Sequence, residues 1–267
     1  MKSYKLAILT VAVGSLLSLN ATAQFSYNNA DLLLGFRTAG GTSDLVVDIG
    51  AASLYTGATG PITISGNYYS SSQLTSAGLT LNNLYFSVFG DISPYNPGAG
   101  TVNTLWVTAP QADPNVQATP FGAQTSASQG NTRAQIEAIA SGAMDFGIGS
   151  SSSVVLASHL NQGSSGDLSY TEGIGGNGNF NGNFGSNNNI EQSTAANFSS
   201  SSLVEGDRLD LFQMTPGSSG SYVGFFELDP NGTLTFNPEP VPEPATFAMF
   251  GLGLAGLAGW RRITRKN

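Results

Sequence analysis

The last part of this 267-residue chain limits how the rest of it can fold. A block rich in proline and glutamate, residues 238–244, is followed by an apolar run from Ala245 to Trp260. At a rise of ~1.5 Å per residue, this run would form a helix about 24 Å long, which is short for a bilayer core of ~30 Å. The basic residues that follow are Arg261, Arg262, Arg265 and Lys266. This order predicts a C-terminal transmembrane helix whose basic end lies in the cytoplasm, with the preceding chain on the far side.

The block before the apolar run has four prolines in seven residues, which favour an extended backbone over a helix or a paired strand. It is either a stiff spacer or a segment that a processing enzyme binds. Val241, Pro242, Glu243 and Pro244, followed by the apolar run and the arginines, resemble the PEP-CTERM sorting signal of Gram-negative bacteria. The resemblance covers about the last 27 residues. It implies recognition by exosortase, a membrane-embedded transpeptidase-like enzyme, so these four residues would be a substrate's recognition motif and not catalytic groups.

The start of the chain is typical of a secretory signal peptide. Two lysines precede an apolar run over residues 6–19, and Ala21 and Ala23 place small residues at both positions that a signal peptidase reads. We therefore predict cleavage between Ala23 and Gln24. An uncleaved anchor is the alternative, but a run of this length is short for a membrane span.

Three segments are therefore expected: a signal peptide at 1–23, an exported domain at 24–237 and a sorting signal at 238–267. Residues 24–239 contain three basic and sixteen acidic residues, a formal charge of −13, which disfavours nucleic acid as a partner. The chain has no cysteine, which excludes disulfides, thiol catalysis and thiolate metal ligation.

Short runs of β-branched and aromatic residues between turn residues predict a mainly β fold, an antiparallel sandwich-like domain. The expected strands cover residues 32–37, 44–49, 62–65, 84–89, 104–108, 154–157, 208–214, 222–228 and 233–236. Asp229-Pro230-Asn231-Gly232 between the last two strands predicts a hairpin turn.

One amphipathic helix is expected to pack on the sheet. Its apolar face has helical spacing and consists of Ile136, Ile139, Ala140, Ala143 and Met144. Thr132 with Gln135 predicts a capping box at its start, and Gly142 indicates termination near its end.

Residues 163–202 are rich in Gly, Ser and Asn, and such a composition provides little core. We expect a mobile loop within one domain; the alternative is a few poor strands with Phe180 and Phe184 pointing inward. Residues 173–178 match G-x-G-x-x-G but lack the flanking strand and helix of a dinucleotide site.

Candidate catalytic residues are few. His159 is the single histidine, so a Ser-His-Asp triad would have to use it and a histidine metal cluster is excluded. Asp44 and Asp48 would share one strand face, as a carboxylate pair for glycoside hydrolysis requires. A second acidic cluster would lie where a loop enters a strand: Glu205, Asp207 and Asp210. Solvated faces are the simpler interpretation of both clusters.

Binding sites are similarly weak. Calcium is an alternative at the second acidic cluster or at Asp229 and Asn231, although neither has EF-hand spacing. The aromatic residues proposed to stack on a sugar are Tyr68, Tyr69, Tyr85 and Trp106, and burial in the core explains the last two equally well.

The sequence thus predicts an exported, non-enzymatic cell-surface or matrix protein, with no cofactor and no metal. It would be anchored in the inner membrane through residues 245–260 before processing. Its expected partners are exosortase, the membrane and extracellular polysaccharide. The alternatives are a polysaccharide- or calcium-binding module and a carboxylate-dependent glycoside hydrolase.

Overall fold

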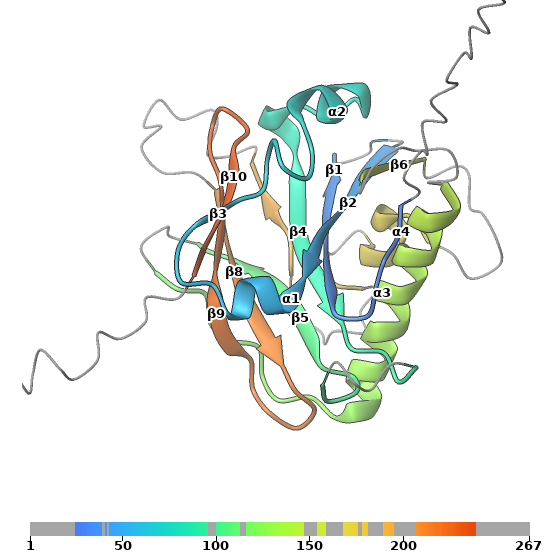
Figure 1. Cartoon of the computed structure of the whole chain (residues 1–267), viewed down its shortest axis with the longest axis vertical. Helices are drawn as coiled ribbons and strands as arrows, with labels where there is room; N and C mark the ends of the chain where they lie inside the picture. Colours follow the sequence, from blue (N-terminus) through green and yellow to red (C-terminus); the bar gives the residue numbers. More distant parts are fainter. Residues whose placement is uncertain are drawn as a thin grey trace, which may run out of the picture.

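The computed structural model describes residues 25–38, 41, 43–95, 100–112, 116–146, 154–158, 168–175, 178–180, 189–194 and 207–238. Within these ranges the chain forms ten strands in one antiparallel sheet, eight of them five residues or longer (Figure 1). The strands are β1 (Asp31–Arg37), β2 (Ser43–Ala51), β3 (Ile62–Thr63), β4 (Tyr85–Asp91), β5 (Leu105–Pro110), β6 (Val154–Ser158), β7 (Gln192–Ser193), β8 (Asp207–Met214), β9 (Ser221–Leu228) and β10 (Leu234–Pro238). The helices are α1 (Ala52–Thr56), α2 (Ser71–Ser76), the 3-10 turn η1 (Leu81–Asn83), α3 (Ser126–Phe146) and α4 (Tyr170–Ile174).

The sheet has the order β3-β10-β9-β8-β5-β4-β1-β2-β6, and β7 pairs with β4 outside this path. All nine expected strands are present, each with bounds within two residues of the prediction. The hairpin between β9 and β10 is also confirmed, because Leu234 pairs with Leu228 across the predicted turn.

The expectation of a sandwich of two sheets is wrong. The single sheet curls into a half-barrel, so that β1 and β2 face β9 and β10 across one core. Helix α1 lies between these two arms, and the ring of Tyr55 packs against Phe226 at 5.7 Å and Phe236 at 5.1 Å between centroids. The twist that accumulates over many strands brings the arms together, so one sheet buries its own inner face.

The outer face of the central strands is covered by α3 and α4 (Figure 1). Ile136, Ile139, Ala140 and Ala143 of α3 are buried there, which confirms the predicted apolar face. The predicted start of this helix is wrong: α3 begins six residues before Thr132.

The ends of α3 differ from the prediction for physical reasons. Thr125 Oγ1 accepts a hydrogen bond from Ser128 N at 3.2 Å, which is the contact of an N-cap residue. Thr132 lies inside the helix, where its hydroxyl donates to Ser128 O. Gly142 does not end the helix; it allows close approach of residue 168, because a Cβ there would lie 2.4 Å from Leu168 O.

The segment expected to be a mobile loop contributes to the core in its described parts. Tyr170, Ile174, Phe180 and Ile190 are fully buried against the outer face of the sheet. The prediction of a loop with little core is therefore wrong for residues 168–175, 178–180 and 189–194, and the inward-pointing alternative is confirmed for Phe180. Phe184 lies outside the described residues.

Strands β4 and β5 separate along their length, and residues 189–194 fill the space between them. β4 pairs with β5 through residues 89–91 and with β7 through Tyr85 and Phe86. Between these pairings, Thr108 Oγ1 accepts from Val88 N at 3.0 Å and donates to Ile190 O at 2.8 Å. The low-complexity segment therefore completes the sheet.

Candidate functional site

Several predicted site residues lie outside the described residues. They are Ala21, Ala23 and Gln24 at the signal cleavage site, Val241, Pro242, Glu243 and Pro244 in the sorting motif, Arg261, Arg262, Arg265 and Lys266 at the basic end, and His159 and Glu205. The body residues of the other predictions can be placed.

The first acidic pair shares one face of β2 as predicted, but each carboxylate has a separate structural contact. Asp44 accepts hydrogen bonds from Thr171 N at 2.8 Å and Thr171 Oγ1 at 2.6 Å, which joins α4 to β2. Asp48 accepts from Gly50 N at 2.8 Å, and burial raises the pKa of Asp48 to about 6. These contacts are those of residues that hold the backbone in place.

The second acidic cluster is not a solvated face, so that expectation is wrong. Asp207 and Asp210 are 1% and 0% exposed and lie on opposite faces of β8, because strand side chains alternate. Asp210 accepts hydrogen bonds from Gln111 Nε2 at 2.6 Å and Ala118 N at 2.5 Å, and burial raises its pKa. Asp207 accepts from Gln192 Nε2 at 3.2 Å. The two residues therefore cannot act as a pair across one cleft.

The candidate calcium residues in the β9–β10 turn hold the turn itself. Asp229 Oδ1 accepts from Asn231 N at 2.9 Å and from Thr233 N at 2.8 Å. Among the residues that the structure describes, no group of three or more His, Asp or Glu side chains could hold a metal ion.

The four aromatic residues proposed as a sugar platform do not form one. Tyr69 and Trp106 are 3% and 5% exposed and belong to the core inside the half-barrel, against which Tyr68 also packs. Tyr85 lies on the opposite face of the sheet, where the guanidinium carbon of Arg37 is 5.1 Å from its ring centroid. The platform prediction is therefore wrong.

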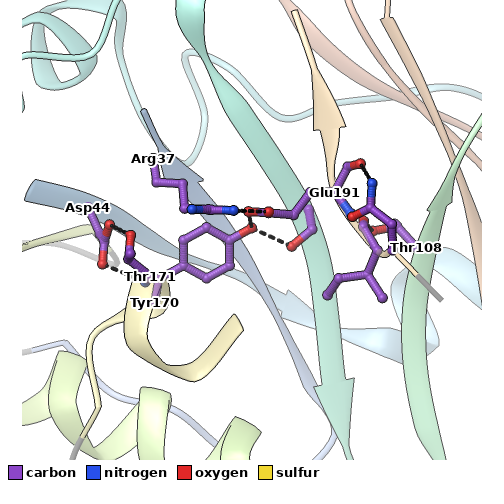
Figure 2. Close-up of polar contacts among 9 residues, drawn as sticks. Arg37, Asp44, Thr108, Tyr170, Thr171 and Glu191 are labelled. Carbon is purple, nitrogen blue, oxygen red and sulfur yellow. Dashed lines mark hydrogen bonds and ion pairs between the residues drawn. The ribbon is translucent and has the colours of Figure 1, made fainter. Parts of the chain in front are cut away.

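A buried polar network lies between β1, α4 and residues 189–194 (Figure 2). Arg37 Nε donates to Glu191 Oε1 at 2.7 Å, and Arg37 Nη2 donates to Glu191 Oε2. Tyr170 OH donates to Glu191 Oε1 at 2.7 Å. Since that hydroxyl proton is used, the Ser87 hydroxyl is the donor in its 2.6 Å contact with Tyr170 OH.

The charge states in this network are fixed by the pair itself. Burial acts to lower the pKa of Arg37, but the hydrogen bond and charge of Glu191 outweigh it and raise that pKa. Burial and then the charge of Glu191 raise the pKa of Tyr170 well above its usual value. A bidentate pair that is almost inaccessible to solvent positions chain segments rather than a ligand. Sequence reasoning missed it because Arg37 and Glu191 are far apart in the chain.

A cleft of about 340 Å³ lies beside α3, and sequence reasoning missed it too. Its wall on α3 has helical spacing: Glu137, Ala140, Ser141 and Met144. The facing wall comes from the loops around β1 and β4: Tyr27, Asn29, Ser93 and Tyr95. Behind it, Tyr27 OH donates to Asp91 Oδ1 at 2.7 Å, and burial raises the pKa of Asp91 to about 7. The cleft combines two tyrosines, a carboxylate and small polar groups.

The described helices include none that is both long and apolar enough to cross a membrane. The predicted transmembrane run, residues 245–260, lies outside the described ranges.

The comparisons with known proteins concern the tail. No curated protein and no solved structure matched the chain. A family model for the PEP-CTERM protein-sorting motif matches residues 240–263, which includes Pro242, Glu243, Pro244 and the apolar run. The resemblance noted in the sequence is confirmed over these residues. The chain therefore carries a PEP-CTERM protein-sorting motif at residues 240–263, which implies an exported protein that exosortase sorts to the cell surface through its C-terminal signal.

Proposed function

We propose that this chain is a non-enzymatic component of the cell surface or extracellular matrix. A signal peptide cleaved after Ala23 exports it, and residues 245–260 hold it in the inner membrane until exosortase processes the tail. The observation that carries this proposal is the PEP-CTERM protein-sorting motif at residues 240–263, which follows β10 closely in the chain.

The described part of the body reaches close to both predicted signals in the chain. Phe25, two residues after the predicted cleavage point, is 2% exposed and packs in the core under α3. At the other end, β10 finishes at Pro238, and the sorting motif begins at residue 240. Export signals at both ends therefore flank a body with its own core, as expected of a folded cargo.

The non-enzymatic part of the proposal is supported by the carboxylates. Asp44, Asp210 and Glu191 each accept two or more hydrogen bonds from groups that hold the fold together. A general acid or base must instead reach a substrate proton from a cleft. Glu137 lines the cleft beside α3, but its carboxylate is paired with Arg133 at 2.9 Å, and Asp91 lies buried behind Tyr27.

A processing experiment tests this proposal. The full chain and a variant with Pro242→Ala, Glu243→Ala and Pro244→Ala would be produced in a Gram-negative host that has exosortase. We expect the wild-type product to begin at Gln24, to lack the mass of the tail and to leave the inner membrane. The variant should begin at Gln24 but stay in the inner-membrane fraction with its tail intact. Fractionation and intact-protein mass spectrometry measure both.

Pro238→Ala is the matched control, because it removes a proline two residues before the motif and should be processed like wild type. The proposal is wrong if wild-type protein stays in the cytoplasm with residues 1–23 attached.

A second candidate function, binding of a neutral sugar unit of a polysaccharide, is favoured by the cleft beside α3. Tyrosine rings suit the apolar faces of a sugar, and the lining offers hydroxyl and amide groups but no basic residue for an anionic ligand. A glycan array with the body and with Tyr95→Ala tests this. Glycan binding that Tyr95→Ala abolishes would support the sugar-binding function, and an array that shows no binding would contradict it.

A further inference from the structure

One end of the sheet is free of charged residues in all its described connecting segments. This is the end where β1, β5 and β9 begin and where β2, β4, β8 and β10 finish. In Figure 1 its lowest parts are the start of β9 and the start of α3, and α1 lies nearer mid-height. The segments gathered there are residues 28–30, 51–61, 92–95, 100–104, 121–125 and 215–220. None of them contains Asp, Glu, Lys or Arg. We call this surface the uncharged end.

Hydrogen bonds join neighbouring segments of this surface. Ser93 N donates to Asn29 Oδ1 at 2.5 Å, and Asn103 Nδ2 donates to Ser126 O at 3.1 Å at the start of α3. Ala52 N donates to Ala30 O at 2.8 Å, and Asn103 N donates to Ile92 O at 2.9 Å. The turn between β8 and β9 makes two backbone hydrogen bonds to the segment before α3. The uncharged end is therefore a property of the fold, assembled from segments that are distant in sequence.

Glu137 of α3 lines the same cleft as Tyr95, but its charge is paired with Arg133 at 2.9 Å. Other acidic residues lie farther away or beneath this surface. Asp145 near the end of α3 is exposed, and Asp229 lies in the β9–β10 turn at the opposite end of the sheet. Asp31, Asp48 and Asp91 lie in the strands behind the uncharged end and are buried or half-buried. A body with a formal charge of −13 is repelled by an anionic lipid surface, and the repulsion is weakest where exposed charge is absent.

The exposed apolar side chains also favour contact between this end and a membrane. Three large apolar side chains are exposed among the described residues, and two of them lie in segments of the uncharged end. They are Leu54, 51% exposed on α1, and Tyr95, 91% exposed after β4. Tyrosine favours the boundary between lipid and water, and leucine gains from shallow burial among headgroups.

The tail is long enough to bring this end to the membrane and too short to keep it far away. Six residues lie between Pro238 and Ala245, where the predicted apolar run begins, so these two residues are at most about 22 Å apart along a proline-rich extended chain. Pro238 pairs with Gly224, and β9 extends three residues further toward the uncharged end, about 10 Å. We infer that the uncharged end rests on the bilayer surface while the tail is inserted, with Leu54 and Tyr95 among the lipid headgroups. This inference rests on the membrane anchoring proposed above.

Because the chain has no cysteine, single labelled positions test the orientation cleanly. Leu54→Cys and Tyr95→Cys would report on the uncharged end, and Asp145→Cys and Asn231→Cys, both exposed positions at the opposite end, would be their controls. Thr63→Cys would report on the exposed edge strand β3. Each full-length variant, labelled with an environment-sensitive fluorophore, is reconstituted in vesicles of phosphatidylethanolamine and phosphatidylglycerol that contain a headgroup-level quencher lipid.

We expect strong quenching at residues 54 and 95 and little at 145 and 231. Equal quenching at both ends, or quenching at 63 alone, would overturn the orientation while leaving the anchor intact. Flotation separates the two ideas: the full chain should float with the vesicles and a chain ending at Pro238 should not. If the full chain does not float, the anchor and the orientation both fail.

Discussion

At the scale of single residues, the pair of Arg37 and Glu191 is the contact whose loss should cost the most. The two side chains are 9% and 2% exposed, so neither charge can regain water if the other is removed. Removing one partner of such a pair typically costs about 3–5 kcal/mol, because a buried charge is left without compensation. We therefore expect Glu191→Gln to lower the free energy of unfolding by about that amount, measured by urea denaturation of the body.

Glu227→Gln provides the matched control. Glu227 pairs with Arg208 at 3.2 Å, but its side chain is 26% exposed and water screens the pair. Its loss should cost less than about 1 kcal/mol. Equal effects of the two substitutions would contradict the special role given to the buried pair.

At the scale of elements, two glycines of α3 should respond oppositely to the same substitution. A Cβ on Gly130 would meet nothing closer than the Asn103 side chain at 3.5 Å, whereas one on Gly142 would lie 2.4 Å from Leu168 O. Gly130→Ala should therefore raise the free energy of unfolding by about 0.5–1 kcal/mol, because alanine lowers the backbone entropy of the unfolded chain. Gly142→Ala should lower it by about 1–3 kcal/mol, because α3 must move away from residue 168.

Urea denaturation of the two variants checks this prediction, and each serves as the control for the other. A stabilising Gly142→Ala would mean that α3 and residue 168 are not packed as closely as described.

The elements also show what sequence could and could not reveal. Strands were predictable because β-branched runs bounded by turn residues report local structure, as in β9 and β10. The helix face of α3 was readable from its spacing, but its start was not, because Thr125 and Thr132 are both plausible caps. The burial of Tyr170 and Ile190 was missed because composition averages over a segment, whereas a few apolar side chains suffice to anchor it.

The candidate sites were less predictable than the fold. The cleft joins Tyr27, Tyr95 and Glu137, and the buried network joins Arg37 and Glu191. These residues come together through strand order and sheet curl, neither of which is encoded in local spacing. Conversely, the sorting motif was readable because its three parts follow one another along the chain.

At the scale of the whole molecule, stability should fall as pH rises through neutrality. Burial raises the pKa of Asp48 to about 6 and that of Asp91 to about 7 in the folded state, whereas unfolded aspartates titrate near 3.8. At pH values between the unfolded and the folded pKa, the folded protein binds more protons than the unfolded chain. The contribution of these two carboxyl groups to the free energy of unfolding is therefore complete below pH ~4 and is lost as pH rises through 6 and 7. For Asp91 alone, the free energy of unfolding should drop by about 2–3 kcal/mol between pH 5 and pH 8.

Asp91→Asn keeps an acceptor for Tyr27 OH but removes the titrating carboxyl group. The free energy of unfolding of this variant should therefore fall by about 2–3 kcal/mol less than that of wild type between pH 5 and pH 8. Asp145→Asn, at an exposed position of α3, should leave the pH profile parallel to wild type. Urea midpoints across this pH range measure the difference, and parallel profiles for wild type and Asp91→Asn would count against a buried, proton-binding Asp91.

The place of β10 has a mechanical consequence. Since the tail follows this strand in the chain, any pull from the membrane on the anchored molecule enters the body at Pro238. The ladder between β10 and β9 runs through five residue pairs, and its hydrogen bonds are perpendicular to the strands. A force along β10 therefore shears these bonds together instead of opening them one by one, so the strand that carries the tether is loaded in its most resistant direction.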